Sequence, residues 1–249
     1  MSLIATAVSF PSAQGPALTC LFGVAGVGAA ETNTTVNFPI ALLENDLVVV
    51  VAYTSADIAS GGLVVESDAV TYTSGSSFVQ VGSGANSLSG EVFYTIMGST
   101  PDTSVRVDGI GGATPDSTGL LVYAFRNADT STPLDVTSTS ATGSTALTIS
   151  AAGITPVTYG ALVLQTISAE GAVTTTFVPT VTAGAEISLG LGHTATETRA
   201  DTDDISVGGT VVYQRLPVAA PALTFGYAGD AGEQYIALSA AVRPAFPGA

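Results

Sequence analysis

The chain has 249 residues, 46% of them hydrophobic, a content that fits a folded globular protein and excludes a disordered one. It carries 20 acidic residues against five arginines and no lysine, so its formal net charge is −15. Such a surface repels phosphate backbones and anionic lipid headgroups, and we therefore expect neither nucleic acid nor a membrane surface as a partner.

A single cysteine, Cys20, excludes an internal disulfide and a zinc site built from several thiolates. It lies in the apolar run 17–22, where we expect a small buried side chain. The first residues lack the Lys or Arg that opens a secretory signal, and no stretch approaches the roughly 18 apolar residues of a membrane span. We expect the protein to be made and folded in a cytoplasm.

Short β-branched runs, bounded by Gly, Pro, Asn or Asp, predict strands rather than helices. Three continuous apolar runs, 47–53, 119–125 and 161–167, are typical of strands in a sheet that is covered on both faces. In chain order, the predicted strands are 47–53, 78–81, 91–97, 104–108, 119–125, 145–149, 161–167, 174–178, 187–191, 210–215, 222–227 and 235–242.

Glycine clusters separate these runs at short intervals, and glycine readily adopts the positive φ of tight turns. Many short strands with this spacing predict an all-β fold, an antiparallel β-sandwich or a barrel. We find no internal repeat and expect one domain over residues 1–249. The stretch 129–144, rich in Thr, Ser and Pro, is the nearest feature to a boundary, and we interpret it as a long surface crossing between the sheets.

The segment FRNADTSTPLDV, residues 125–136, places charges and a proline at a predicted strand end. Pro133 fixes φ and removes a hydrogen-bond donor where the chain leaves a turn. Either Asp129 or Asp135 can accept bonds from nearby backbone amides, and Arg126 can pair with either carboxylate. We expect Arg126, Asp129 and Asp135 to form a structural clasp.

The densest acidic cluster is the segment 197–204. Calcium prefers several oxygen ligands on one loop, but the spacing lacks the glycine and the terminal glutamate of an EF-hand. We interpret the segment as a solvated acidic loop. A calcium site is the first alternative, and a pair of glycosidase carboxylates is the last. The candidate calcium ligands are Glu197, Asp201, Asp203 and Asp204.

Motifs of catalysis are missing from the sequence. His193 is the single histidine, which excludes metal sites built from several imidazoles, and no nucleophile elbow accompanies it. Phosphate-binding loops and nucleotide fingerprints are also missing. We therefore predict no catalytic set and no cofactor.

Five segments carry motifs in a fixed order: ENDLVVVV (44–51), EVFYTIM (91–97), LVYAFRNADTSTPLDV (121–136), the stretch 150–164, and AAVRPA (240–245). They resemble GDLLVVVV, a YYRVA-like strand, VYAFRGVDTTTPLDV, a small-residue lead-in to GALVLA, and ALRPA of a recurrent family of tailed-phage and prophage virion proteins. The portion 125–136 is the most specific. Asn45 and Asn127 stand where that family usually has glycine, and the tryptophan of some members is absent.

The resemblance implies a jelly-roll-like sandwich with a structural role rather than catalysis. We therefore expect a non-enzymatic virion protein, a capsid decoration or cement protein on the outer surface of a tailed phage. The virion setting implies major capsid or tail subunits as partners and a homo-oligomer, such as a trimer.

Two alternatives stay open. One is a tail-associated or host-adsorption module that binds glycan, and the other is a calcium-stabilised lectin-like domain. Glycan binding usually needs exposed aromatic rings, whereas we expect the aromatic residues here to pack in the core or across strands. The aromatic candidates for exposure are Tyr72, Phe78, Tyr159, Phe177 and Tyr227.

Overall fold

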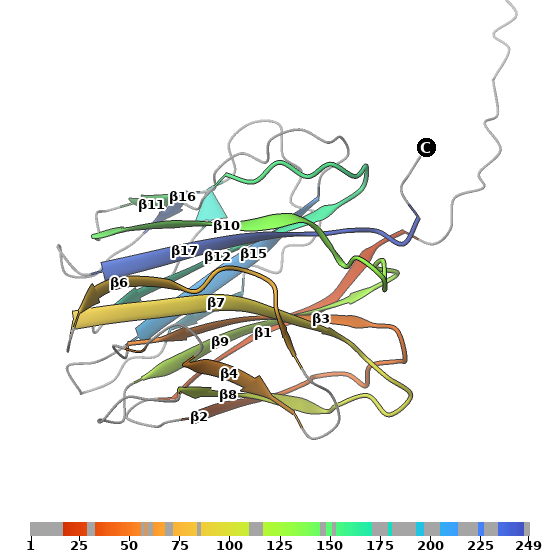
Figure 1. Cartoon of the computed structure of the whole chain (residues 1–249), viewed down its shortest axis with the longest axis horizontal. Helices are drawn as coiled ribbons and strands as arrows, with labels where there is room; N and C mark the ends of the chain where they lie inside the picture. Colours follow the sequence, from red (N-terminus) through yellow and green to blue (C-terminus); the bar gives the residue numbers. More distant parts are fainter. Residues whose placement is uncertain are drawn as a thin grey trace, which may run out of the picture.

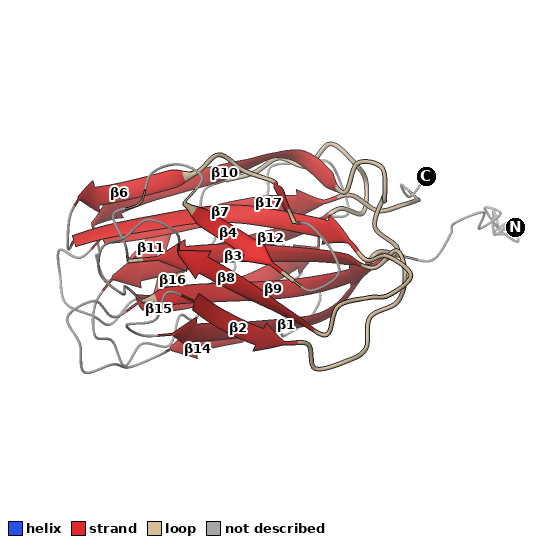
Figure 2. Cartoon of the chain, turned by 60° about the horizontal axis from the view of Figure 1, so that its bottom comes forward, coloured by secondary structure: helices blue, strands red, loops and turns tan. Residues whose placement is uncertain are grey.

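A computed structural model of the chain describes residues 17–28, 33–55, 58, 62–67, 72–83, 86–109, 117–144, 148–150, 153–170, 179–180, 193–196, 205–213, 224–226 and 234–246. These residues form antiparallel strands joined by turns and loops, and none of them is helical (Figure 2). The predicted all-β class is therefore confirmed. The jelly-roll topology and the single domain stay predictions.

A six-stranded sheet lies in the middle of the molecule. Its order is β1-β9-β3-β7-β5, and β6 also pairs with β7. All eight residues of β3 are buried, as are all but the last of β9, because both faces of this sheet are covered. This confirms the interpretation of the continuous apolar runs. The strands are β1 (Thr19–Gly28), β3 (Leu47–Thr54), β5 (Thr73–Ser74), β6 (Val79–Ser83), β7 (Asn86–Ile96) and β9 (Thr118–Arg126).

A five-stranded sheet of order β10-β17-β12-β15-β14 covers one face of the six-stranded sheet. The two sheets share a hydrophobic core in which Tyr53 and Tyr123 face Leu164 and Leu238. Cys20 lies in the same core, 5% exposed, as predicted, and burial raises the pKa of its thiol to about 12. The strands are β10 (Leu134–Ser144), β12 (Leu162–Glu170), β14 (His193–Thr196), β15 (Ile205–Tyr213) and β17 (Gln234–Val242).

Two small sheets form the outer layers. The sheet β2-β8-β4, made of β2 (Asn33–Asn37), β8 (Ser104–Gly109) and β4 (Leu63–Glu66), covers the other face of the six-stranded sheet through a second core. The sheet β11-β16-β13 contains β11 (Thr148–Ser150), β16 (Thr224–Gly226) and β13 (Pro179–Thr180). Figure 1 shows β11 and β16 on the outer side of the five-stranded sheet, so the layers are stacked.

The two halves of the chain repeat one strand order. In the first half, the large sheet has the order β1-β9-β3-β7 and the small sheet the order β2-β8-β4. In the second half, β10-β17-β12-β15 and β11-β16-β13 have the same arrangement, and the first four strands of each half alternate between its large and its small sheet. The prediction that no internal repeat exists is therefore wrong at the level of topology. Strand order can recur without matching residues, because a strand requires a pattern and not an identity.

Local conformation repeats at the same places. Asn45 (φ 70°) precedes β3 by two residues, and Gly160 (φ 81°) precedes β12 by two. Arg126 ends β9, and Arg243 directly follows β17. The registers agree, since the first residue of β3 or β12 pairs with the residue just before the arginine: Leu47 with Phe125, and Leu162 with Val242.

The interpretation of 129–144 as a surface crossing is wrong for most of its length. Residues 134–144 form β10, the edge strand that pairs with β17, and the crossing is confined to residues 127–133 after β9. Thr and Ser suit an edge strand, which is half exposed, so polarity alone did not distinguish it from a loop. The predictions at 174–178 and 187–191 lie outside the described residues. Strands not predicted include β1, β2 and β4.

Glycines make room for the tyrosines that join the two large sheets. Tyr53 Oη lies 2.8 Å from Thr166 Oγ1 of the facing sheet, in a hydrogen bond between buried side chains. A Cβ at Gly90, opposite Tyr53 in the ladder, would lie 2.7 Å from the tyrosine ring, and one at Gly209 would lie 2.5 Å from Tyr123 Oη. Glycine is therefore required by close packing in this core.

We expect Gly90→Ala to lower the free energy of unfolding by about 1–3 kcal/mol, because the added methyl group overpacks a rigid aromatic contact. Gly98→Ala is the matched control, since a Cβ there has no atom within 4 Å. Urea unfolding of both variants measures the difference. Equal midpoints for the two would contradict the packing explanation.

Candidate functional site

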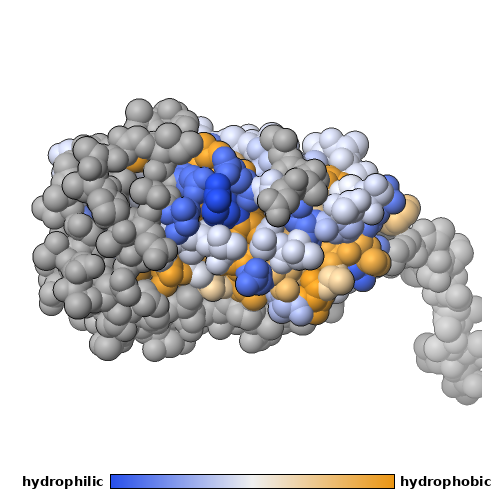
Figure 3. Space-filling view, turned by 90° about the horizontal axis from the view of Figure 1, so that it is seen from below, coloured by the Kyte–Doolittle hydropathy of each residue, from blue (hydrophilic) through white to orange (hydrophobic). Residues whose placement is uncertain are grey.

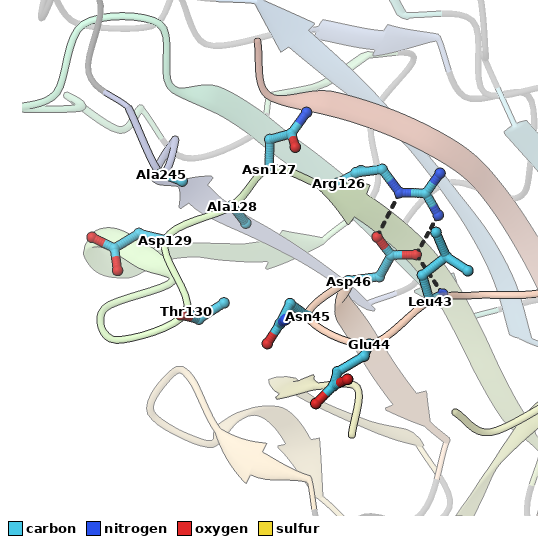
Figure 4. Close-up of a pocket in the computed structure, with 10 residues that line it drawn as sticks. All are labelled: Leu43, Glu44, Asn45, Asp46, Arg126, Asn127, Ala128, Asp129, Thr130 and Ala245. Carbon is cyan, nitrogen blue, oxygen red and sulfur yellow. Dashed lines mark hydrogen bonds and ion pairs between the residues drawn. The ribbon is translucent and has the colours of Figure 1, made fainter. Parts of the chain in front are cut away.

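A hollow of about 540 Å³ lies at one end of the large sheets, where β9 ends and β3 begins (Figure 4). Residues 43–46, residues 126–130 and Ala245 line it. Three segments that are far apart in the sequence therefore meet here.

Arg126 holds Asp46 with two parallel hydrogen bonds. Its Nε donates to Oδ1 at 2.8 Å, and its Nη2 donates to Oδ2 at 2.6 Å. The Asp46 side chain is 3% exposed and also accepts the backbone N–H of Leu43 at 2.8 Å. The hydrogen bond with Asp46 raises the pKa of Arg126. This geometry is the bidentate fork typical of strong arginine–carboxylate pairs.

The predicted pairing of Arg126 with Asp129 or Asp135 is therefore wrong. The register of β3 and β9 places Asp46 beside the end of β9, although 80 residues separate Asp46 from Arg126 along the chain. Nearness in the sequence favoured the wrong carboxylates, because ladder partners are non-local.

Asp135 pairs with Arg243 instead. Arg243 Nε donates to Oδ1 at 3.1 Å, and the backbone N–H groups of Val157 and Thr158 donate to Oδ2 at 2.6 and 3.0 Å. Burial alone would raise the pKa of Asp135, but the hydrogen bonds from Thr158, Val157 and Arg243 outweigh it and lower that pKa. The expected bonds from backbone amides to Asp135 are confirmed.

Asp129 organises its own turn. Its Oδ1 accepts the backbone N–H and the hydroxyl of Ser131, at 2.8 and 2.7 Å, and the N–H of Thr132 at 3.1 Å. The hydrogen bonds from Ser131 lower the pKa of Asp129, so the carboxylate stays charged. The predicted amide bonds of Asp129 are confirmed, but among the described residues it forms no ion pair with an arginine.

Two asparagines of the hollow have left-handed backbone conformations. Asn45 has φ 70° and Asn127 has φ 65°, and they are the non-glycine residues with positive φ in the described part of the chain. Asn127 Nδ2 also donates to the carbonyl of Ala17 at 2.9 Å. Asparagine tolerates this conformation better than most other residues with a Cβ.

Backbone bonds tie the two halves together at this end. Ala245 N donates to Asn127 O at 2.8 Å, Asp129 N donates to Arg243 O at 2.9 Å, and a β-bridge joins Ala128 to Pro244. Each half thus contributes one arginine–carboxylate pair, and the chain just after β9 is fixed to the chain just after β17. We call this double arrangement the clasp: Arg126 with Asp46, and Arg243 with Asp135.

The other sequence candidates fall partly inside and partly outside the described part of the chain. Glu197, Asp201, Asp203 and Asp204 lie outside the described residues, as do Phe177 and Tyr227. The backbone of His193 begins β14. Tyr72 is 8% exposed, and Phe78 and Tyr159 are partly buried.

Within the described residues, no three His, Cys, Asp or Glu side chains gather as a metal site would require. A search of the same residues for a helix long and apolar enough to span a bilayer finds none. Comparison of the chain with family models, with curated proteins and with solved structures gives no match.

The charges of the clasp are engaged in holding the chain. Both guanidinium groups bind carboxylates, and both paired carboxylates also accept backbone N–H groups. These bonds therefore hold the backbone at this end of the molecule in one conformation. Sequence reasoning missed Asp46 and Arg243, although each lies in a segment that carries the family resemblance, ENDLVVVV or AAVRPA.

We expect Arg126→Ala to destabilise the fold because it leaves the Asp46 carboxylate buried without its cation. Removing one partner of a fully buried pair costs about 3–5 kcal/mol, but the Arg126 side chain is 37% exposed, so we expect about 1–3 kcal/mol. Arg106→Ala is the control, since its pair with Glu66 is 45% and 47% exposed and should contribute little. Thermal unfolding by circular dichroism tests the order of the two variants; an equal loss would show that burial does not matter here.

Asp135 should make the wild-type protein acid-sensitive. Because its folded pKa is lowered, the stability it contributes is present above its ordinary pKa, about 3.9, and is lost as the pH falls through the lower folded value. Asp135→Asn should therefore be less stable than wild type at pH 7, with the gap closing below about pH 4. Melting temperatures from pH 2 to 7 measure this gap, and a constant gap would contradict the assignment.

Glu91 on β7 should show the opposite trend. Burial raises its pKa, although a hydrogen bond from the Ser74 hydroxyl lowers it in part. The contribution of a group with a raised folded pKa is present at low pH and is lost as the pH rises through that value. Glu91→Gln, which still accepts the Ser74 bond, should gain stability over wild type between pH 4 and 7 in the same melting series. A gain that shrinks over this range would refute it.

Proposed function

We propose that the chain is a non-enzymatic structural protein of a tailed-phage virion, a decoration or cement subunit on the outer surface of the capsid. The observation that carries the proposal is where the family-like segments lie in the fold. Segments 44–51 and 121–136 meet through Arg126 and Asp46, and segment 240–245 supplies the second arginine of the clasp. The resemblance therefore concentrates on residues that hold the fold together.

The two departures from the family motifs support the same reading. Asn45 and Asn127 replace glycine where the backbone has φ of 70° and 65°. Both positions require a left-handed backbone, which asparagine tolerates. Asparagine therefore keeps the conformation that a glycine would have there.

The architecture suits a protein that works through contact area. Its layers bury continuous apolar strands, and only 10% of its residues are charged. Stable protein contacts bury on the order of 1,600 Å², which flat, rigid β-layers present with little side-chain entropy to lose. We propose major capsid or tail subunits as the partners.

The copy number of the chain in purified virions tests the proposal. Quantitative mass spectrometry should find it at tens to hundreds of copies per particle, because a decoration subunit repeats over the capsid lattice. A count near the number of tail or fibre subunits would support the host-adsorption alternative. Absence from intact particles would reject both roles.

The calcium-stabilised alternative has a separate test. A melting temperature that does not change between excess Ca²⁺ and EDTA would remove it, because a ligand that binds the folded state must raise its stability.

A further inference from the structure

The large hydrophobic side chains that are exposed gather at one end of the molecule. In the described part of the chain they are Ile40, Leu43, Val157 and Phe246, which are 45%, 55%, 61% and 56% exposed. Single exposed apolar residues are ordinary on a protein surface, but a group at one end indicates an interaction surface. Figure 3 shows hydrophobic side chains gathered at the right-hand end of the view.

Each of the four residues lies in a segment that contains or contacts a residue of the clasp. Leu43 lines the hollow together with Ala245, the neighbour of Phe246, and Ile40 belongs to the same loop as Leu43. The backbone N–H of Val157 donates to Asp135. We call this surface, made of Ile40, Leu43, Val157 and Phe246 together with the hollow that Leu43 lines, the clasp end.

The clasp end is also negatively charged. Glu44 is exposed on the rim of the hollow, and Asp129 is a carboxylate with a lowered pKa on the opposite rim (Figure 4). Neither forms an ion pair with an arginine among the described residues, whereas Arg126 and Arg243 are already bound to Asp46 and Asp135. Besides the hydrogen bonds from Ser131, the nearby charge of Arg243 contributes to the lowered pKa of Asp129, but the four described carboxylates of this end, Glu44, Asp46, Asp129 and Asp135, outnumber its two described guanidinium groups. Apolar side chains therefore lie beside a net negative charge.

A second copy of the chain fits this surface poorly. The chain contains no lysine, and the three arginines in the described residues, Arg106, Arg126 and Arg243, all form ion pairs. A contact between two clasp ends would bring Glu44 and Asp129 of both copies into one interface, and the described residues offer no unpaired arginine to offset these charges. Like charges across an interface cost several kcal/mol and suppress such pairing.

We propose that the clasp end docks onto a different protein, on an apolar patch flanked by Lys or Arg side chains. This rests on the proposed function, in which the partner is a subunit of the particle. The exposed apolar residues supply the contact area, and Glu44 and Asp129 meet the basic flanks. Because the clasp fixes the backbone at this end beforehand, docking orders little further chain.

The test uses phage particles assembled without this chain and the purified full-length chain added back. Bound protein is measured by co-sedimentation at 50 and 300 mM NaCl. We expect wild-type binding to weaken with salt, and Leu43→Ser and Glu44→Lys each to weaken it about tenfold at low salt. Glu66→Lys is the control with the same change of charge, since Glu66 is also exposed but lies on β4 in the outer sheet, and it should bind like wild type.

The outcomes separate the two proposals. If wild type binds and the Leu43 and Glu44 variants, with unchanged melting temperatures, bind equally well, the clasp end is not the docking surface and the proposed function stands. If Glu66→Lys weakens binding as much as Glu44→Lys, the effect is one of net charge and the inference is wrong. If wild type binds no particle, the proposed function fails. Self-association in sedimentation velocity that Leu43→Ser abolishes would make a second copy the occupant and overturn the inference.

Discussion

Both faces of the six-stranded sheet are buried, and this burial governs where the chain can place charged side chains. A strand such as β3, with eight buried residues, must satisfy its backbone groups through the ladders on either side and can hold few polar side chains. The two arginine–carboxylate pairs of the clasp accordingly lie at the ends of strands, where the chain turns. Arg126, the last residue of β9, is the first position at which a side chain of that strand reaches water.

The repeated strand order places the same demand on each half. In both halves an arginine stands at the end of an interior strand, β9 or β17. A residue with left-handed backbone stands just before the neighbouring strand, β3 or β12. The carboxylates differ, because Asp46 precedes β3 whereas Asp135 belongs to β10. The common requirement is that an arginine at a strand end be neutralised, and either neighbouring strand can supply the anion. Each half of the chain therefore meets this requirement with one arginine–carboxylate pair.

The composition gives this rigid end its chemical character. A chain with no lysine, whose described arginines are used internally, presents carboxylates and apolar side chains to its surroundings. Such a surface favours partners with opposite charge and exposed apolar area, and it disfavours contact with the same surface of another copy of the chain. A virion subunit that must bind a lattice without forming free aggregates would need this combination.

The sequence alone was enough to predict the class of fold and the continuous buried strands. These follow from local patterns: valine runs such as 47–53 need two covered faces, and Cys20 among apolar neighbours is buried. It also placed charge at the end of β9. Three features emerged only from the folded chain: Arg126 binds Asp46, 80 residues away; Asp135 binds Arg243, 108 residues away; and β10 is a strand. The reason is that strand register joins residues without regard to their separation in the chain, so partners across a ladder leave no local signal.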